Sequence, residues 1–234
     1  MKRVVFISGH PDDHMTAAGF LSLLKRRGYE LFEIVLTGGS GGYVSADEKN
    51  TIVSTRMKEF SRASDLLGMK KTSCLGYDEH VLAMNKENVE AVTKILREVR
   101  PDIIILPNRD DYHETHLETN KIATKAIRTA MKMRKLELGE PIAPSVILEW
   151  EYSVPHQPDV VVDISDYWEL KKALMECYGS QINEAEFRKT EGLSVYRGAS
   201  IGVRHGEGFR INRFLPLRLD KIMELIETGH CSDK

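Results

Sequence analysis

The chain of 234 residues has little cysteine, only two tryptophans and no long apolar run. Its cysteines, Cys74, Cys177 and Cys231, are odd in number and far apart, which argues against a disulfide framework and indicates a cytoplasmic location. The apolar run near the N-terminus, VVFIS, is shorter than the roughly 7–15 residues of a signal peptide. No run approaches the ~20 residues that span a bilayer. We therefore expect no membrane partner.

The charges are almost balanced, which excludes another class of partner. Lys and Arg total 33 and Asp and Glu total 35, so the formal net charge is −2. This balance provides no basic field for nucleic acid, and no nucleic-acid partner is expected. A hydrophobic content of 41% with 29% charged residues is typical of a globular protein. The length favours a single domain over residues 1–234.

Short β-branched segments alternate along the chain with longer amphipathic ones. This alternation predicts an α/β fold: a Rossmann-like, doubly wound and mostly parallel sheet with helices on both faces. Strands are expected at 4–8, 30–37, 72–75, 100–107, 145–152 and 159–165. Helices are expected at 15–28, 50–67, about 86–99, beyond the loop after residue 107, and at about 166–178 and 216–228.

In such a sheet the strand order reverses between the first strand and the strand that opens the second half. Ligands bind in the crevice beyond the carboxyl ends of these two strands. Here they are 4–8 and 102–106, and the loops that follow them read GHPDDH and PNRDDYHETH. Both loops are rich in His and Asp, so we expect them to meet.

The spacing in these loops indicates a metal site. His10 and Asp13 are three residues apart at a loop-to-helix transition, and His113 and His116 have the same spacing where a later helix begins. Two His and one Asp make a three-ligand Zn²⁺ site with a position left for water, the catalytic pattern. A spare carboxylate could then accept a proton, and a spare imidazole could bind an oxyanion or act as acid. Each loop alone is equally compatible with a helix cap and solvated histidines.

At these residues the chain resembles the LmbE-like or PIG-L zinc-dependent N-deacetylases. The first family motif, (A/G)HPDDE, corresponds to GHPDDH, and the second, HPDH, corresponds to HETH. The similarity continues through the pattern RxxExxxAxxxLG at 56–68, LGY at 75–77, CYGSQ at 177–181 and RGASIGVRHGEGFR at 197–210. The resemblance implies the LmbE-like fold and a homo-oligomer, because trimers and hexamers are common in the family.

The resemblance also implies a role for each residue of the two motifs. His10, Asp13 and His116 would bind one Zn²⁺ per chain, with other divalent metals as alternatives. Asp12 would be the general base that activates the water. His113 would bind the developing oxyanion or serve as the acid.

Three further residues are expected to contact the substrate. Arg56 matches an arginine that grips sugar hydroxyls in family members, although its spacing from Glu59 also fits an exposed ion pair. The acidic residue of the family pattern LGYxD aligns with Glu79, or with Asp78 if the loop shifts by one. Tyr112 either lines the pocket or packs under its loop.

Besides Glu79 in place of the Asp of LGYxD, the chain departs from the family at its two metal motifs. His14 stands where the family usually has Glu, and Glu114-Thr115 replaces Pro-Asp before the last ligand. Neither change removes a metal ligand. A further feature, GGSGG at 38–42, is either a mobile turn or lid, or a place where backbone amides approach the substrate.

The resemblance implies a zinc-dependent hydrolase that removes the acetyl group from an N-acetylated amino sugar, such as an N-acetylglucosamine glycoside or conjugate. Two alternatives stay open. One is a zinc amidase that acts on a larger thiol or antibiotic-type conjugate. The other is a catalytically silent, metal-dependent sugar-binding module, which the departures at His14 and Thr115 keep open.

Overall fold

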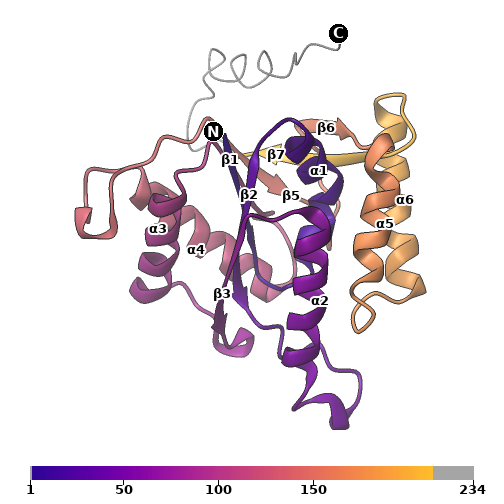
Figure 1. The fold of residues 1–234 in the computed structure, drawn as a ribbon, viewed down its shortest axis with the longest axis horizontal. Coiled ribbons are helices and arrows are strands. Elements are labelled where there is room, and N and C mark those ends of the chain that lie inside the picture. The colour runs from indigo at the N-terminus through magenta and orange to yellow at the C-terminus, as the bar shows by residue number, and fades with distance from the viewer. Residues whose placement is uncertain (1, 213–234) are drawn as a thin grey trace.

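The computed structural model describes residues 2–212, and within this range seven strands form one sheet in the order β3-β2-β1-β4-β5-β7-β6 (Figure 1). Strands β1 to β5 are mutually parallel, and β7 runs antiparallel to both of its neighbours. The prediction of a mostly parallel sheet is therefore confirmed. The strands are β1 (Arg3–Ser8), β2 (Glu30–Thr37), β3 (Lys71–Tyr77), β4 (Ile103–Pro107), β5 (Val146–Trp150), β6 (Val160–Asp163) and β7 (Gly206–Ile211).

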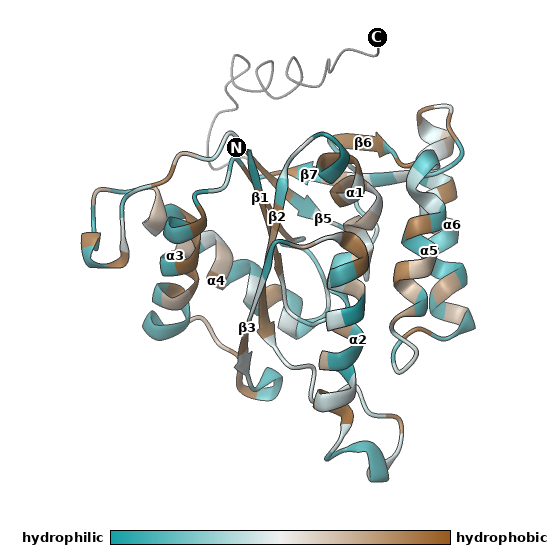
Figure 2. Cartoon of the chain, in the orientation of Figure 1, coloured by the Kyte–Doolittle hydropathy of each residue, from teal (hydrophilic) through white to brown (hydrophobic). Residues whose placement is uncertain are grey.

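Helices cover both faces of the sheet because successive strand residues point to opposite sides. In β1, Val4 and Phe6 pack with α1, α2 and α5, whereas Val5 and Ile7 pack with α3 and α4. Figure 2 shows the apolar side of α3 turned toward the sheet. None of the described helices is both long and apolar enough to cross a membrane. The helices are α1 (Ala18–Arg26), α2 (Ile52–Leu67), α3 (Lys86–Val99), α4 (Glu114–Ala130), α5 (Trp168–Glu176) and α6 (Glu184–Ser200).

The structure contains a helix, α6, and a strand, β7, that the apolar periodicity of the sequence did not predict. The buried residues of α6 are Thr190, Ser194, Arg197 and Gly198, so this helix has no apolar stripe. It approaches β7 through glycine: a Cβ on Gly198 would lie 2.7 Å from the backbone of Arg204, which only a glycine avoids. The helix expected at 216–228 and Cys231 lie outside the described residues.

The strand order places the two polar loops side by side. β1 and β4 are neighbours, with Val4 opposite Ile103, while β2 and β5 lie on their outer sides. The loops after β1 and β4 therefore leave the same edge of the sheet at the point where the strand order reverses. This is the crevice that the sequence predicted.

A buried carboxylate from β7 anchors the helix behind the first loop. Glu207 accepts the N–H groups of Gly19 and Phe20 at 2.9 and 2.8 Å, which satisfies free donors at the start of α1. Lys171 Nζ donates to the same carboxylate at 2.7 Å and to the carbonyl of Thr16 at 3.0 Å. The orientation of α1, and with it the end of the HPDDH loop, is therefore held from the antiparallel edge of the sheet.

Candidate metal centre and substrate cavity

The loop after β1 folds around the carboxylate of Asp13. Its Oδ2 accepts the backbone N–H of Gly9 at 2.8 Å and of His10 at 2.9 Å. Its Oδ1 faces His10 and His116 instead. Gly9 allows the loop to approach α4, because a Cβ there would lie 3.1 Å from the methyl carbon of Thr115.

Three donor atoms from the two loops form a compact triangle. His10 Nδ1 lies 3.3 Å from His116 Nε2 and 3.5 Å from Asp13 Oδ1, and His116 Nε2 lies 3.2 Å from the same oxygen. A tetrahedral ion with ligand bonds of about 2.0–2.1 Å has ligand–ligand edges of roughly 3.3 Å. The triangle therefore has the size of one face of a zinc tetrahedron, and all three side chains are buried.

The charge around the triangle favours a cation. Burial opposes a charge on the His116 ring, but the carboxylates of Asp13 and Asp111 outweigh it and raise the pKa of His116 to about 10. Burial also opposes the charge of Asp13, yet the neighbouring histidines hold its pKa well below the usual range. The carboxylates that favour a proton on His116 favour a divalent cation at the same place.

Each donor residue is oriented by a second contact. His116 Nδ1 lies 3.1 Å from Asp111 Oδ2, and His10 Nε2 lies 3.3 Å from Glu79 Oε2. Contacts of this kind set the tautomer and the ring angle of a metal-ligating histidine. Asp111 was not among the predicted site residues. The sequence could have indicated Asp111, because it is an acidic residue two positions before His113 in the same loop.

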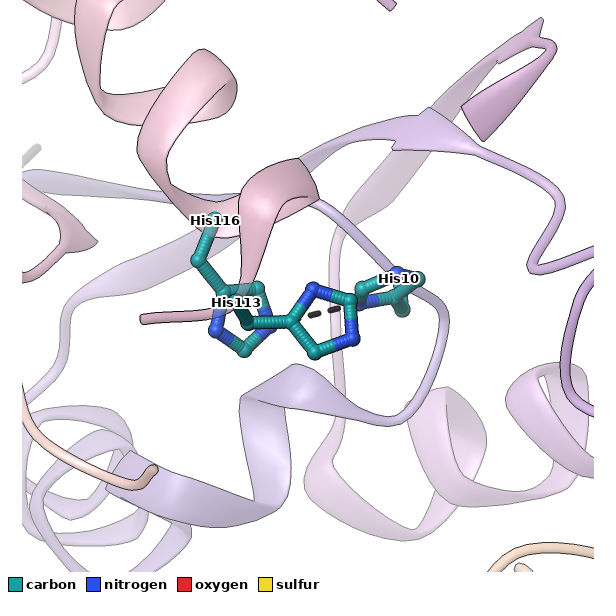
Figure 3. A group of neighbouring side chains, drawn as sticks. All are labelled: His10, His113 and His116. Atoms are coloured by element: carbon teal, nitrogen blue, oxygen red, sulfur yellow. Dashed lines mark hydrogen bonds between the residues drawn. The ribbon is translucent and has the colours of Figure 1, made fainter. Parts of the chain in front are cut away.

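His113 stands beside the triangle at the N-cap of α4. Its ring stacks on His116 with centroids 4.6 Å apart and meets the edge of His10 at 4.8 Å (Figure 3). The ligand atoms of these three histidines lie within 4.8 Å of one another, a looser set than the triangle that includes Asp13. Burial and the nearby histidines lower the pKa of His113, which favours a neutral ring.

The fold places the guanidinium of Arg56 next to the carboxylate of Asp12. Its Nη2 forms an ion pair with Asp12 Oδ1, its Nη1 donates to the carbonyl of Gly39 at 3.1 Å, and the side chain is buried. The alternative of an exposed Arg56–Glu59 pair is therefore wrong, and Glu59 instead accepts from Ser180. The GGSGG segment packs on this guanidinium, because a Cβ on Gly39 would overlap Arg56 Nη1.

Glu79, and not Asp78, faces the site. Glu79 Oε1 accepts from the backbone N–H of Gly41 and from Ser40 Oγ. Burial raises the pKa of Glu79, but His10 and the Gly41 N–H outweigh this and lower it to about 2. Asp78 is exposed and caps the short turn that follows. Tyr112 is 69% exposed at the rim of the cavity, so it does not pack under its loop.

The departure at His14 is accompanied by a buried carboxylate that the sequence analysis missed. His14 Nδ1 lies 2.8 Å from Glu33 Oε2, and its Nε2 lies 2.8 Å from Tyr178 Oη. Tyr178 donates to the carbonyl of Pro11 at 2.8 Å, so the His14 ring nitrogen is the donor to Tyr178. The signal was Glu33, a second Glu at an interior position of the otherwise apolar strand ELFEIVLT.

All eight residues predicted for the site line one cavity of about 550 Å³. They come from the loops after β1, β3 and β4 and from α2 and α4. The structure adds Tyr152, Ser153 and Gln181 to the wall. Gln181 lies in the CYGSQ segment, to which the sequence analysis assigned no role.

A family model described as the GlcNAc-PI de-N-acetylase family, PIG-L, matches residues 5–127, which is more than half of the chain. The chain belongs to the PIG-L family. It is 26% identical over 221 residues to a diacetylchitobiose deacetylase of Thermococcus kodakarensis, covering 90% of this chain and 83% of the relative. Other curated relatives are named as deacetylases of N-acetylglucosaminyl compounds, so the homologues of this PIG-L chain include enzymes that act on N-acetylated amino sugars.

Solved structures agree with this assignment. The N,N'-diacetylchitobiose deacetylase of Pyrococcus horikoshii superposes with a TM-score of 0.82 at 29% identity, covering 90% of this chain and 84% of that chain. This confirms the expected fold. A more distant relative, at 24% identity over 77% of this chain and 74% of its own, is a 4-oxalmesaconate hydratase of Pseudomonas putida. Relatives of this PIG-L chain therefore include more than one chemistry.

The contact between Asp111 and His116 predicts the metal affinity of an Asp111→Asn variant. Losing the carboxylate should weaken Zn²⁺ binding about 10–100-fold, because the ligand ring loses its fixed orientation. Titration against a competing chelator measures this. Asp110→Asn is the matched control, since Asp110 is exposed and pairs with Arg210 instead. Equal affinities of the two variants would contradict the assigned role of Asp111.

The His14–Glu33 pair predicts that restoring the usual family residue is harmful. His14→Glu would set two buried carboxylates against each other and should lower the free energy of unfolding by about 3 kcal/mol or more. Adding Glu33→His restores an acid–imidazole pair and should recover most of the loss. Urea denaturation of the single and double variants completes a mutant cycle. If the effects of the two substitutions on the free energy of unfolding are simply additive, this interpretation is wrong.

Proposed function

We propose that the chain is a metal-dependent N-deacetylase that hydrolyses the acetamido group of an N-acetylated amino sugar. The observation that carries this proposal is the triangle of His10, Asp13 and His116 donors in the wall of an open cavity. The deacetylase relatives support the same reaction. We assign Zn²⁺, one per chain, to these residues, because imidazole and carboxylate donors on a tetrahedral face suit this ion.

The chain's own residues supply the proton transfers. An ion at this site supplies Lewis acidity that polarises an acyl carbonyl and acidifies water. Asp12 accepts the proton of the attacking water, whose oxygen forms a bond to the acetyl carbon. Arg56 holds one Asp12 oxygen and leaves the other for this proton. As the C–N bond breaks, Asp12 returns this proton to the amine nitrogen, and acetate and the free amino sugar leave.

His113 is assigned to the oxyanion. Its ring lies against both metal-site histidines, and its lowered pKa favours the neutral form, which donates one hydrogen bond without adding charge. Glu79 and Tyr112, which both line the cavity, are assigned to the sugar. The silent-module alternative rested on His14 and Thr115. Glu33 contacts His14, and Asp111 contacts His113 and His116 on either side of Thr115; these carboxylates support an active site instead.

No observation favours the larger thiol or antibiotic-type conjugate over a simple glycoside. A homo-oligomer, trimeric or hexameric, and a cytoplasmic location also stay predictions. So does the single domain over residues 1–234.

The assignment of Asp12 is tested by Asp12→Ala. We expect the variant to keep its Zn²⁺, because the donor triangle is untouched, and to lose about 10²–10⁴-fold in kcat through loss of the general base. Acetate release from N-acetylglucosamine glycosides and metal content by mass spectrometry give the two readouts. Normal turnover would remove Asp12 from the mechanism.

We assign Arg56 to the positioning of Asp12, in place of the binding of sugar hydroxyls that the resemblance implied. Arg56→Lys and Arg56→Ala should then lower kcat, with Lys retaining more activity, while KM for the glycoside stays within about twofold. Arg62→Ala is the matched control on the same helix, where the exposed Arg62 reaches only a carbonyl. A rise in KM at unchanged kcat would instead support binding of the sugar hydroxyls by Arg56.

A further inference from the structure

A fully buried carboxylate lies on β5, outside the wall of the substrate cavity. Glu149 is 0% exposed and stands between Leu148 and Trp150, which belong to the apolar core. The other residues of this strand are apolar. Burying an ionised carboxylate is costly unless the group is paired and hydrogen-bonded. An acidic side chain at this position therefore calls for a reason other than packing.

The partner of Glu149 is Arg109, in the loop between β4 and α4. Arg109 Nε donates to Glu149 Oε2 at 2.9 Å, and its Nη2 lies 2.8 Å from Oε1, so the guanidinium fork spans both oxygens. The backbone N–H of Arg109 also donates to Oε2, at 3.3 Å. Asn212 Nδ2 donates to Oε1 at 2.6 Å. The carboxylate is thus fully engaged, and it ties the loop to β5 through both the side chain and the backbone of Arg109.

This attachment lies close to the residue that orients a metal ligand. Asp111 follows Arg109 by two positions in the short connection to α4. Its Oδ1 accepts the backbone N–H of His113 at 2.9 Å, and its Oδ2 lies 3.1 Å from His116 Nδ1. Because one residue separates Arg109 from Asp111, holding the first fixes where the carboxylate of the second lies.

The same strand also contacts the ring of His116 directly. Trp150 follows Glu149 and points to the opposite face of the sheet. Its ring meets the ring of His116 at a centroid distance of 5.1 Å and an interplanar angle of 79°. Two successive residues of β5 therefore reach this histidine. Trp150 does so by contact, and Glu149 does so through Arg109 and Asp111.

An ion pair here supplies direction more than stability. Replacing a buried ion pair by apolar residues of similar volume is often neutral or stabilising, because two charges no longer have to leave water. Apolar contact is non-directional, however, and lets a loop settle in several positions. The fork of Arg109 on Glu149 allows one. The side chain of Arg109 is 42% exposed, so the cation keeps part of its hydration while the buried carboxylate sets its place.

We propose that Glu149 is a positioning residue for the metal centre: it holds Arg109, and through it Asp111, so that the His116 imidazole points at the ion. Glu149 itself touches neither the ion nor the substrate. The inference rests on the metal site of the proposed function. It requires that the geometry of the bound metal, and not the stability of the chain, depends on the Arg109–Glu149 pair.

The test replaces the pair by apolar residues in the full chain, as Arg109→Met with Glu149→Leu. We expect a Tm equal to or above that of the unmodified chain, because no buried charge is left unpaired. Zn²⁺ affinity, measured against a competing chelator, should fall about tenfold through loss of the ring orientation. Co²⁺ loaded in place of Zn²⁺ should show a changed visible absorption, since this absorption depends on the arrangement of the ligands.

Two further variants separate position from charge and provide the control. Arg109→Lys keeps a cation beside Glu149 but cannot span both oxygens, so its Zn²⁺ affinity should lie between those of the unmodified chain and the double variant. It gives the same measurement if the double variant does not fold. Asp110→Asn changes an exposed residue of the same loop and should leave both the Zn²⁺ affinity and the Co²⁺ absorption unchanged.

The outcomes separate this inference from the function on which it rests. An unchanged Zn²⁺ affinity and Co²⁺ absorption in the folded double variant, or in Arg109→Lys if only that variant folds, would overturn the positioning role and leave the deacetylase intact. If the unmodified Zn²⁺-loaded chain releases no acetate from N-acetylglucosamine glycosides, the deacetylase function is wrong. The two metal measurements would then still decide the role of Glu149.

Discussion

The carboxylate of Asp13 joins the two halves of the site. One of its oxygens binds the backbone of Gly9 and His10 in the loop after β1, and the other faces the rings of His10 and His116. A buried carboxylate in this position is stable only if its charge is compensated. The compensation comes from His116, more than a hundred residues away, and so the arrangement requires β1 and β4 to be neighbours. The rest of the fold keeps that adjacency in place.

A second layer of acidic residues surrounds this centre and sets its geometry. Asp111 fixes the ring of His116, Glu79 contacts His10, and Glu33 pairs with His14 beneath the loop. Each is a carboxylate with an imidazole partner, so these buried or half-buried carboxylates are hydrogen-bonded rather than isolated. The departures at His14 and Thr115 lie among these partners. The HPDDH loop therefore has a carboxylate beside it, as the usual family motif does, but Glu33 of β2 supplies this carboxylate in place of residue 14.

Most of the fold could be predicted from the sequence because its central strands β1 and β4 are buried on both faces and most of its helices are amphipathic. VVFIS and IIILP are continuous apolar runs, and α3 keeps an apolar stripe, so their type and order were evident. In contrast, α6 buries Thr190, Ser194 and Arg197 and packs through glycine, so periodicity carried no signal there. The antiparallel strand β7 follows that helix and was missed with it.

By itself the sequence determined which residues can bind a metal and on which loops they lie, because residue type and spacing to a strand end are local properties. Only the tertiary structure decided the pairings: Arg56 with Asp12, Asp111 with His116, Glu33 with His14, and Glu79 rather than Asp78 at the centre. These contacts join segments that are distant in the chain or depend on which way a loop turns. Their partners are selected by charge compensation in a space that exists only once the sheet and its helices have packed.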